Sequence, residues 1–131
     1  MPITWNNIDN GKGIEVIIAG DISTQEILLV MNEISQDDTL NDRTWELWDF
    51  STVGDFDISS DDIQLITESD KKFIESKKGL FIKVGAHSKD LTFGMGRVYE
   101  AYSVSHPNVH IRAFWSRTEA VEWINKLLQE T

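Results

Sequence analysis

The sequence lacks cysteine, and this absence removes several classes of protein at once. Without a thiol among the 131 residues, the chain has no disulfide framework, cysteine nucleophile, zinc ribbon or iron–sulfur cluster. Long apolar runs are also missing, because the longest, residues 14–19, contains Glu15 and is far shorter than the roughly 20 residues that cross a bilayer. The first residues lack the basic start and apolar segment of a secretory signal, so we expect a cytoplasmic protein without a membrane span.

Positive charge is scarce as well. The chain has 12 Lys and Arg against 22 Asp and Glu, which gives a formal net charge of -10. Such a surface repels the phosphates of nucleic acids, so we expect no nucleic acid as a partner. The three histidines, His87, His106 and His110, show no pairing at ligand spacing, and the acidic clusters lack the pattern of a calcium loop. We therefore expect no metal and no cofactor.

Strand and helix patterns alternate along the chain. Asn10-Gly11 favours a tight hairpin between the first two strands. Runs rich in branched and aromatic residues predict strands at residues 3–8, 14–19, 44–50, 80–85 and 109–114, the last near a sheet edge. Apolar stripes of helical period begin behind four serines, which we expect to cap the helices: Ser23, Ser59, Ser88 and Ser116.

Two segments interrupt these patterns. Residues 51–57 contain glycine and two aspartates, and we expect them to be irregular. Asp70 interrupts the apolar stripe of the second helix. We expect Asp70 at the edge of the core, or paired with Lys71 or Lys77.

The order of elements, β-β-α-β-α-β-α-β-α, predicts a single α/β domain over residues 1–131. The hairpin makes the first two strands antiparallel, and each later crossover through a helix returns a parallel strand. We therefore expect a five-stranded mixed, mostly parallel sheet with four helices.

Over its whole length, from Met1-Pro2-Ile3 onward, the chain resembles the SpoIIAA-like family, whose fold is that of STAS domains and is related to the CRAL-TRIO lipid-carrier group. The resemblance runs through Asp49-Phe50-Ser51, and its most specific parts are residues 90–102 and residues 119–124. The resemblance implies a non-enzymatic protein and a carrier of apolar molecules. It also implies an alternative, since STAS anti-sigma-factor antagonists are switched by serine phosphorylation where the helix after the third strand begins. The matching positions, Asp57-Ile58-Ser59-Ser60, make Ser59 and Ser60 candidate phosphorylation sites.

A catalytic triad is the main enzymatic alternative. Asp49, Ser51 and His87 fall at the ends of neighbouring predicted strands, where α/β folds place their sites. The sequence has no G-x-S-x-G motif, and His87 has no second ligand or carboxylate at suitable spacing. We therefore expect no enzyme.

The third predicted helix contains an unusual pair of glycines, Gly94 and Gly96. Glycine costs a helix about 1 kcal/mol relative to alanine, so the pair indicates close packing on the sheet or a ligand groove. The chain also has more aromatic residues than a small core needs, and some should form an exposed apolar rim. The candidate ligand-binding residues are Phe93, Met95, Tyr99, Tyr102 and Trp115.

These observations lead to two hypotheses for a domain that binds rather than catalyses. The first is a carrier or sensor that holds an apolar small molecule between the third helix, the last helix and the sheet. The second is a protein–protein interaction module that presents residues 51–62 to a kinase-like or regulatory partner, under control of serine phosphorylation. An aromatic patch would also suit a homodimer. An enclosed apolar cavity favours the carrier, and an exposed aromatic patch favours the partner.

Overall fold

A computed structural model describes residues 2–103 and 106–130 of the chain. The described residues form five strands, four α-helices and one short 3-10 helix, η1. In chain order the elements are β1 (Ile3–Ile8), β2 (Gly13–Ser23), α1 (Thr24–Ser35), η1 (Asp38–Leu40), β3 (Trp45–Asp57), α2 (Ser60–Ser76), β4 (Phe81–Ala86), α3 (Asp90–Tyr102), β5 (Val109–Phe114) and α4 (Arg117–Gln129).

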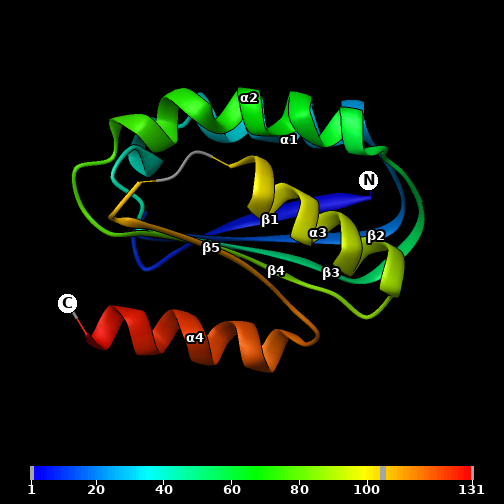
Figure 1. Ribbon diagram of the computed structural model, residues 1–131. Helices are drawn as coiled ribbons and strands as arrows, with labels where there is room; N and C mark the ends of the chain where they lie inside the picture. The colour runs from blue at the N-terminus through cyan, green and yellow to red at the C-terminus, as the bar shows by residue number, and fades with distance from the viewer. Residues whose placement is uncertain (1, 104–105, 131) are drawn as a thin grey trace.

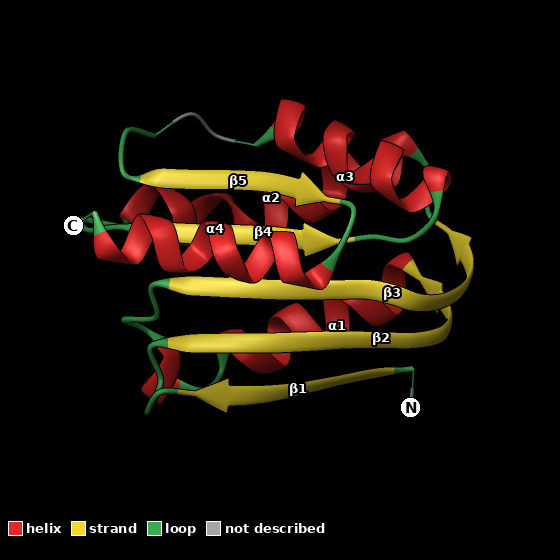
Figure 2. Ribbon diagram, turned by 90° about the horizontal axis from the view of Figure 1, so that it is seen from below, coloured by secondary structure: helices red, strands yellow, loops and turns green. Residues whose placement is uncertain are grey.

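The strands form one sheet in the order β1-β2-β3-β4-β5 (Figure 2). β1 is antiparallel to β2, and the remaining neighbours are parallel. Helices α1, α2 and α3 cover one face of the sheet, and α4 covers the other (Figure 1). The α/β class, the order of elements and the mixed sheet with β5 at its edge are confirmed.

The two faces of the sheet have separate apolar cores. Successive side chains of a strand point to opposite faces, so Trp48 of β3 packs into the core beneath α1 and α2, whereas the neighbouring Leu47 packs beneath α4. Ile14 and Val16 of β2 belong to the first core and are fully buried. No helix within the described residues is long and apolar enough to cross a membrane.

The prediction that residues 51–57 are irregular is wrong. They continue β3 to Asp57 and pair with the second half of β2, with two shifts of register along the pair. Asp21 of β2 accepts a hydrogen bond from the backbone N–H of Asp55 at 2.8 Å. Gly54 is required beside this contact, because a Cβ there would lie 2.4 Å from the same Asp21 oxygen. Polar groups of this segment therefore find their hydrogen-bond partners in β2.

Three of the four predicted serine caps stand at helix starts. Ser59 and Ser116 each accept a backbone N–H of the first turn, at 3.2 and 3.1 Å. Ser23 precedes α1, and its backbone N–H and hydroxyl both donate to Glu26. The prediction for Ser88 is wrong, because α3 begins one residue later, with Lys89 in the cap position. The Ser88 hydroxyl instead donates to the Ser51 carbonyl.

Candidate functional site

The four parallel strands end at one edge of the sheet, and every α-helix begins there (Figure 2). In open α/β sheets this carboxyl edge is where binding sites are commonly found. Hydrogen bonds from two side chains, Ser88 and Lys89, fix the loop before α3 against the end of β3. The Ser88 hydroxyl reaches Ser51 at 2.8 Å, and Lys89 donates to the carbonyls of Val53 and Gly54 at 2.6 and 3.3 Å.

The start of α2 lies at this edge and is held by a reciprocal pair of hydrogen bonds. The Ser59 hydroxyl accepts the backbone N–H of Asp62, and the Ser59 N–H donates to the Asp62 carboxylate at 3.0 Å. These bonds hold the pKa of Asp62 below its ordinary value. Ser59 and Ser60 are both exposed to solvent.

The surface around this helix start is acidic. Asp55, Asp57 and Asp61 are exposed, and residues 49–62 contain no lysine, arginine or histidine. Acidic side chains in the first turn of a helix complement the positive end of its dipole, which stabilises α2. The same carboxylates present a negative surface to any partner that approaches this edge.

An exposed apolar rim occupies another part of the carboxyl edge. Trp115 follows β5 and is 47% exposed, with its ring stacked on Phe93 at a centroid distance of 3.9 Å. Leu91, in the first turn of α3, is 55% exposed. Tyr102 is exposed as well, but it lies at the other end of α3. The predicted ligand-binding residues are therefore not brought together at one site.

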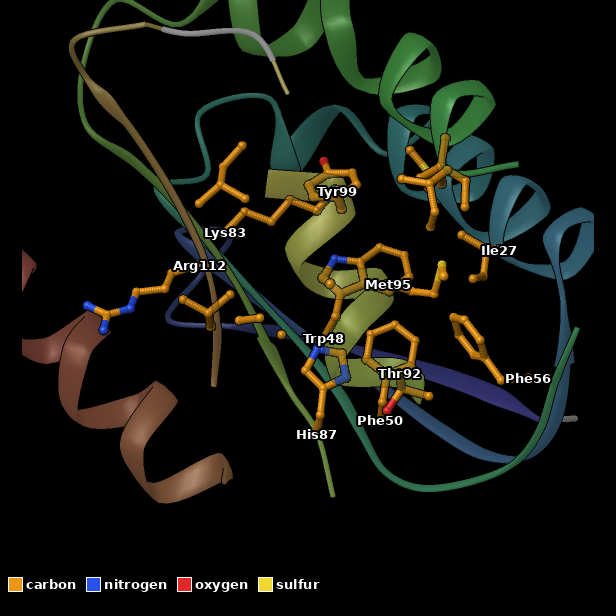
Figure 3. A pocket seen from close by; sticks show the side chains of 18 residues that line it. Ile27, Trp48, Phe50, Phe56, Lys83, His87, Thr92, Met95, Tyr99 and Arg112 are labelled. Carbon is orange, nitrogen blue, oxygen red and sulfur yellow. The ribbon is translucent and has the colours of Figure 1, made fainter. Parts of the chain in front are cut away.

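Met95 and Tyr99 lie on the inner side of α3 and line a cavity of about 90 Å³ (Figure 3). This cavity is bounded by α1, α2, α3 and the sheet, and Phe93, Tyr102 and Trp115 do not line it. The expected place for a ligand, between α3, α4 and the sheet, is wrong because α3 and α4 cover opposite faces (Figure 1). An apolar stripe shows which side of a helix packs on the sheet, but not which face of the sheet receives it.

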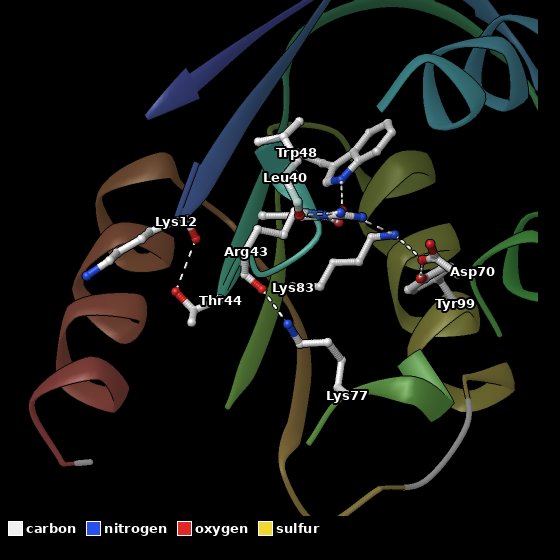
Figure 4. A network of polar contacts seen from close by, with 10 residues as sticks. Lys12, Leu40, Arg43, Thr44, Trp48, Asp70, Lys77, Lys83 and Tyr99 are labelled. Atoms are coloured by element: carbon white, nitrogen blue, oxygen red, sulfur yellow. Dashed lines mark hydrogen bonds and ion pairs between the residues drawn. The ribbon is translucent and has the colours of Figure 1, made fainter. Parts of the chain in front are cut away.

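A buried ionic cluster lies beside the cavity (Figure 4). Lys83 of β4 forms an ion pair with Asp70 of α2, and the Tyr99 hydroxyl donates to the same carboxylate. Lys83 also lies 3.6 Å from Glu46, which accepts hydrogen bonds from Arg43 at 2.7 Å and from the Trp48 indole at 2.8 Å. The prediction for Asp70 is wrong: it is buried, and its partner is Lys83.

The cluster stabilises the charged forms of Glu46 and Lys83. Burial alone would raise the pKa of Glu46, but Lys83, Arg43 and the hydrogen bonds lower it to about 2. Burial opposes the charge of Lys83 too, but Asp70, Tyr99 and Glu46 together outweigh burial and raise the pKa of the ammonium group. The pKa of Tyr99 is raised, first by burial and then by Asp70. At neutral pH two cations therefore balance two carboxylates, with a neutral tyrosine as donor.

Asp49, Ser51 and His87 do not form a catalytic triad. Asp49 accepts both the backbone N–H and the hydroxyl of Ser51, at 2.9 and 2.6 Å. In a triad the aspartate accepts from Nδ1 of the histidine, whereas Nδ1 of His87 is buried without a hydrogen-bond partner among the described residues. Burial lowers the pKa of His87 to about 4, against the opposite effect of Asp49. Within the described part of the chain, no group of three acidic or histidine side chains could hold a metal ion.

No protein-family model matches the chain, and no curated protein sequence matches it. Among solved structures, the anti-sigma factor antagonist SpoIIAA in its unphosphorylated form is similar, with 12% sequence identity and a TM-score of 0.56. The match covers 95% of this chain and 96% of that chain. At this identity the likeness shows the fold, and it agrees with the resemblance expected from sequence. The chain therefore has a fold similar to that of SpoIIAA, the STAS fold.

Proposed function

We propose that the chain is a protein-interaction module of the STAS type that binds a regulatory partner through the start of α2. We call this surface the α2 edge and define it by Asp55, Asp57, Ser59, Ser60 and Asp61. The observation that carries the assignment is the match over 95% of the chain to an anti-sigma factor antagonist, a protein named for acting on another protein. The α2 edge is the exposed surface that follows the third strand of this fold.

The charge of the α2 edge defines the chemistry of the partner. All five of its residues are exposed, three of them are aspartates, and residues 49–62 contain no positive charge. A partner with lysine or arginine side chains on its surface would be steered to this edge and held there by ion pairs. Leu91 and Trp115 on the same edge of the sheet supply exposed apolar area, which charged contacts alone lack.

Phosphorylation of Ser59 or Ser60 is the regulatory step in this proposal. A phosphate at either serine would meet the free N–H groups and the positive end of the α2 dipole. Asp61 and Asp62 would repel it, and a phosphate on Ser59 would compete with Asp62 for the Ser59 N–H. Phosphorylation therefore rearranges the first turn of α2 as well as adding charge, which changes the surface that the partner contacts.

Intact-mass measurement on protein from its own host tests this step. We expect a species heavier by one phosphoryl group, with fragmentation locating it on Ser59 or Ser60. The phosphorylation switch would be contradicted if the protein has an unmodified mass both when it is bound to its partner in cells and when it is free.

We also propose that the protein is not an enzyme. Three of the four groups with strongly shifted pKa values, Glu46, Lys83 and Tyr99, bond to one another or to Asp70 inside the fold, and such a closed network stabilises a structure. The fourth, His87, is buried and has no carboxylate bonded to its Nδ1 within the described residues, so the orienting partner of a catalytic base is missing. The carrier hypothesis stays a prediction, and a cavity of about 90 Å³ has room for about three water molecules, which is too little for a lipid chain.

Site-specific photo-cross-linking tests the α2 edge. A photoreactive amino acid replaces Gln64, an exposed residue in α2, or Gln129, an exposed residue at the end of α4 on the opposite face. We expect irradiation of host cells to give a cross-link to one partner protein from position 64 and none from position 129. A cross-link to a second copy of the chain would instead support the homodimer expected from sequence.

Charge reversal makes the same experiment quantitative. Asp57→Lys with Asp61→Lys should abolish the cross-link from position 64, because it reverses the charge of the α2 edge. Glu122→Lys with Glu130→Lys changes the net charge equally on exposed residues at α4 and should leave the cross-link intact. Equal loss in both double variants would mean that the contact depends on net charge alone, and the α2 edge would be the wrong surface.

A further inference from the structure

The cavity beneath α3 is apolar over most of its wall. Ile27 and Met31 of α1, Phe50 and Phe56 of β3 and Met95 of α3 line it (Figure 3). Its volume of about 90 Å³ exceeds the space that ordinary packing leaves between side chains. Two of these lining residues are methionines, whose flexible thioethers can move to admit a larger molecule.

One polar side chain in the cavity wall lacks a partner. His87 is 3% exposed, and its Nδ1 has no hydrogen-bond partner among the described residues. Its ring stacks on Phe50 at a centroid distance of 5.0 Å. Gly85 and Gly96 make room for it, since a Cβ at either would lie within 2.8 Å of His87 Nε2. A buried polar atom without a partner is energetically unfavourable, so this arrangement needs an explanation.

The other polar groups around the cavity are already engaged. Lys83 and Tyr99 both bond to Asp70, and the Thr92 hydroxyl donates to the Lys89 carbonyl at 3.2 Å. The side chain of Arg112 points away from the cavity (Figure 3). A ligand in the cavity would therefore meet apolar walls and one neutral imidazole, because the pKa of about 4 keeps His87 uncharged at neutral pH.

We propose that this cavity binds a compact, uncharged, mostly apolar molecule with one hydroxyl group, such as a small alcohol or a phenol, and that the hydroxyl bonds to His87. A hydroxyl group both donates and accepts, so it suits either tautomer of a neutral imidazole. A charged ligand would lose its hydration without an opposite charge free to pair with it. A water molecule needs two to four polar partners, whereas this ligand needs only one. None of the five residues of the α2 edge lines this site, although Phe56, which does line it, stands between Asp55 and Asp57.

Phenol and benzene are the matched probes, since they differ only in the hydroxyl group. Each is titrated into the full chain, and binding is followed by NMR of the Met31 and Met95 methyl groups and of the His87 ring nitrogens. We expect saturable shifts at both methyl groups, with phenol binding about 2- to 10-fold more tightly than benzene, the range given by one net hydrogen bond. Phenol should also shift the His87 nitrogen resonances more than benzene does.

His87→Phe keeps an aromatic ring and removes the nitrogen atoms, so it should abolish the preference for phenol over benzene. His110→Phe is the control, because His110 lies in β5 against Trp123 of α4, outside the cavity wall. If His87→Phe does not fold, the proposal is tested on the wild-type protein alone, by the difference in affinity between phenol and benzene and by the shifts of the His87 nitrogen resonances. Failure of both probes to shift the methionine methyl groups, or an unchanged phenol preference in His87→Phe, would overturn the proposal.

Discussion

Removal of the Asp70 carboxylate should destabilise the fold strongly, although Asp70 lies outside the proposed partner surface. In Asp70→Ala, Lys83 loses its nearest anion and the Tyr99 hydroxyl loses its acceptor. Breaking a buried ion pair from one side costs about 3 to 5 kcal/mol. Glu46 remains 3.6 Å from the ammonium group, so we expect the lower end, about 3 kcal/mol. With an m-value of about 1.5 kcal/mol/M, the urea midpoint should fall by about 2 M.

A double-mutant cycle separates the ion pair from general damage to α2. The double variant Asp70→Leu with Lys83→Met removes both charges. Its loss in free energy of unfolding should be smaller, by at least about 1.5 kcal/mol, than the summed losses of the two single variants. Glu68→Ala changes an exposed residue of the same helix and should stay within about 0.5 kcal/mol of the wild type. A loss below about 1 kcal/mol in Asp70→Ala, or simple additivity in the cycle, would refute the account of the cluster.

Four further variants test other parts of the fold by urea unfolding. The pKa of His87 is lowered from 6.5 to about 4, so between these pH values the unfolded chain binds more protons than the folded chain, and stability falls as the pH falls from 6.5 to 4. His87→Phe should remove about 3 kcal/mol of this loss of stability. An unchanged dependence of stability on pH in His87→Phe would contradict this. Ser59→Ala removes the cap of α2 and should cost about 1 kcal/mol, so an unchanged midpoint would exclude a capping role. Gly94→Ala places its new Cβ in open space and should raise the free energy of unfolding by up to about 1 kcal/mol. Gly96→Ala places its Cβ against the His87 ring and should lower the free energy of unfolding by about 1 to 3 kcal/mol. Equal effects of the two variants would refute the close packing of Gly96 on His87.

The acid limb of the stability curve has a second source in Glu46. Its pKa is lowered from 4.5 to about 2, so its contribution is complete above pH 4.5 and is lost as the pH falls from 4.5 to 2. That range begins near pH 4, where the loss of stability caused by His87 ends. The residual acid sensitivity of His87→Phe should therefore lie mainly below pH 4.5.

The sequence predicts the elements of this fold well because their signals are local. A turn at Asn10-Gly11, periodic apolar residues and a serine before each stripe involve neighbours within one or two helical turns. Ser59 belongs to this class, and its position at the start of α2 is confirmed. The continuation of β3 through residues 51–57 is not visible in this way, because β2 supplies its hydrogen-bond partners from about 30 residues away.

The cavity and the ionic cluster depend on contacts between distant segments. Asp70 looked like an edge residue because its partner, Lys83, lies 13 residues further along the chain in another element. One signal was available: Lys83 stands among apolar residues of a strand predicted to be buried, and a buried lysine needs an anion. His87 gave no such sign, because the place of its ring between Gly85 and Gly96 exists only once α3 packs on the sheet.

The most direct test of the proposed function is to map the contact surface on the labelled domain. The partner captured by cross-linking from Gln64 is purified and added to the ¹⁵N-labelled chain, and the backbone amide resonances are followed. We predict that residues 55–62 shift or broaden in the complex, while α4 stays unchanged. Shifts confined to α4, with residues 55–62 unaffected, would contradict the assignment of the α2 edge as the surface that binds the partner.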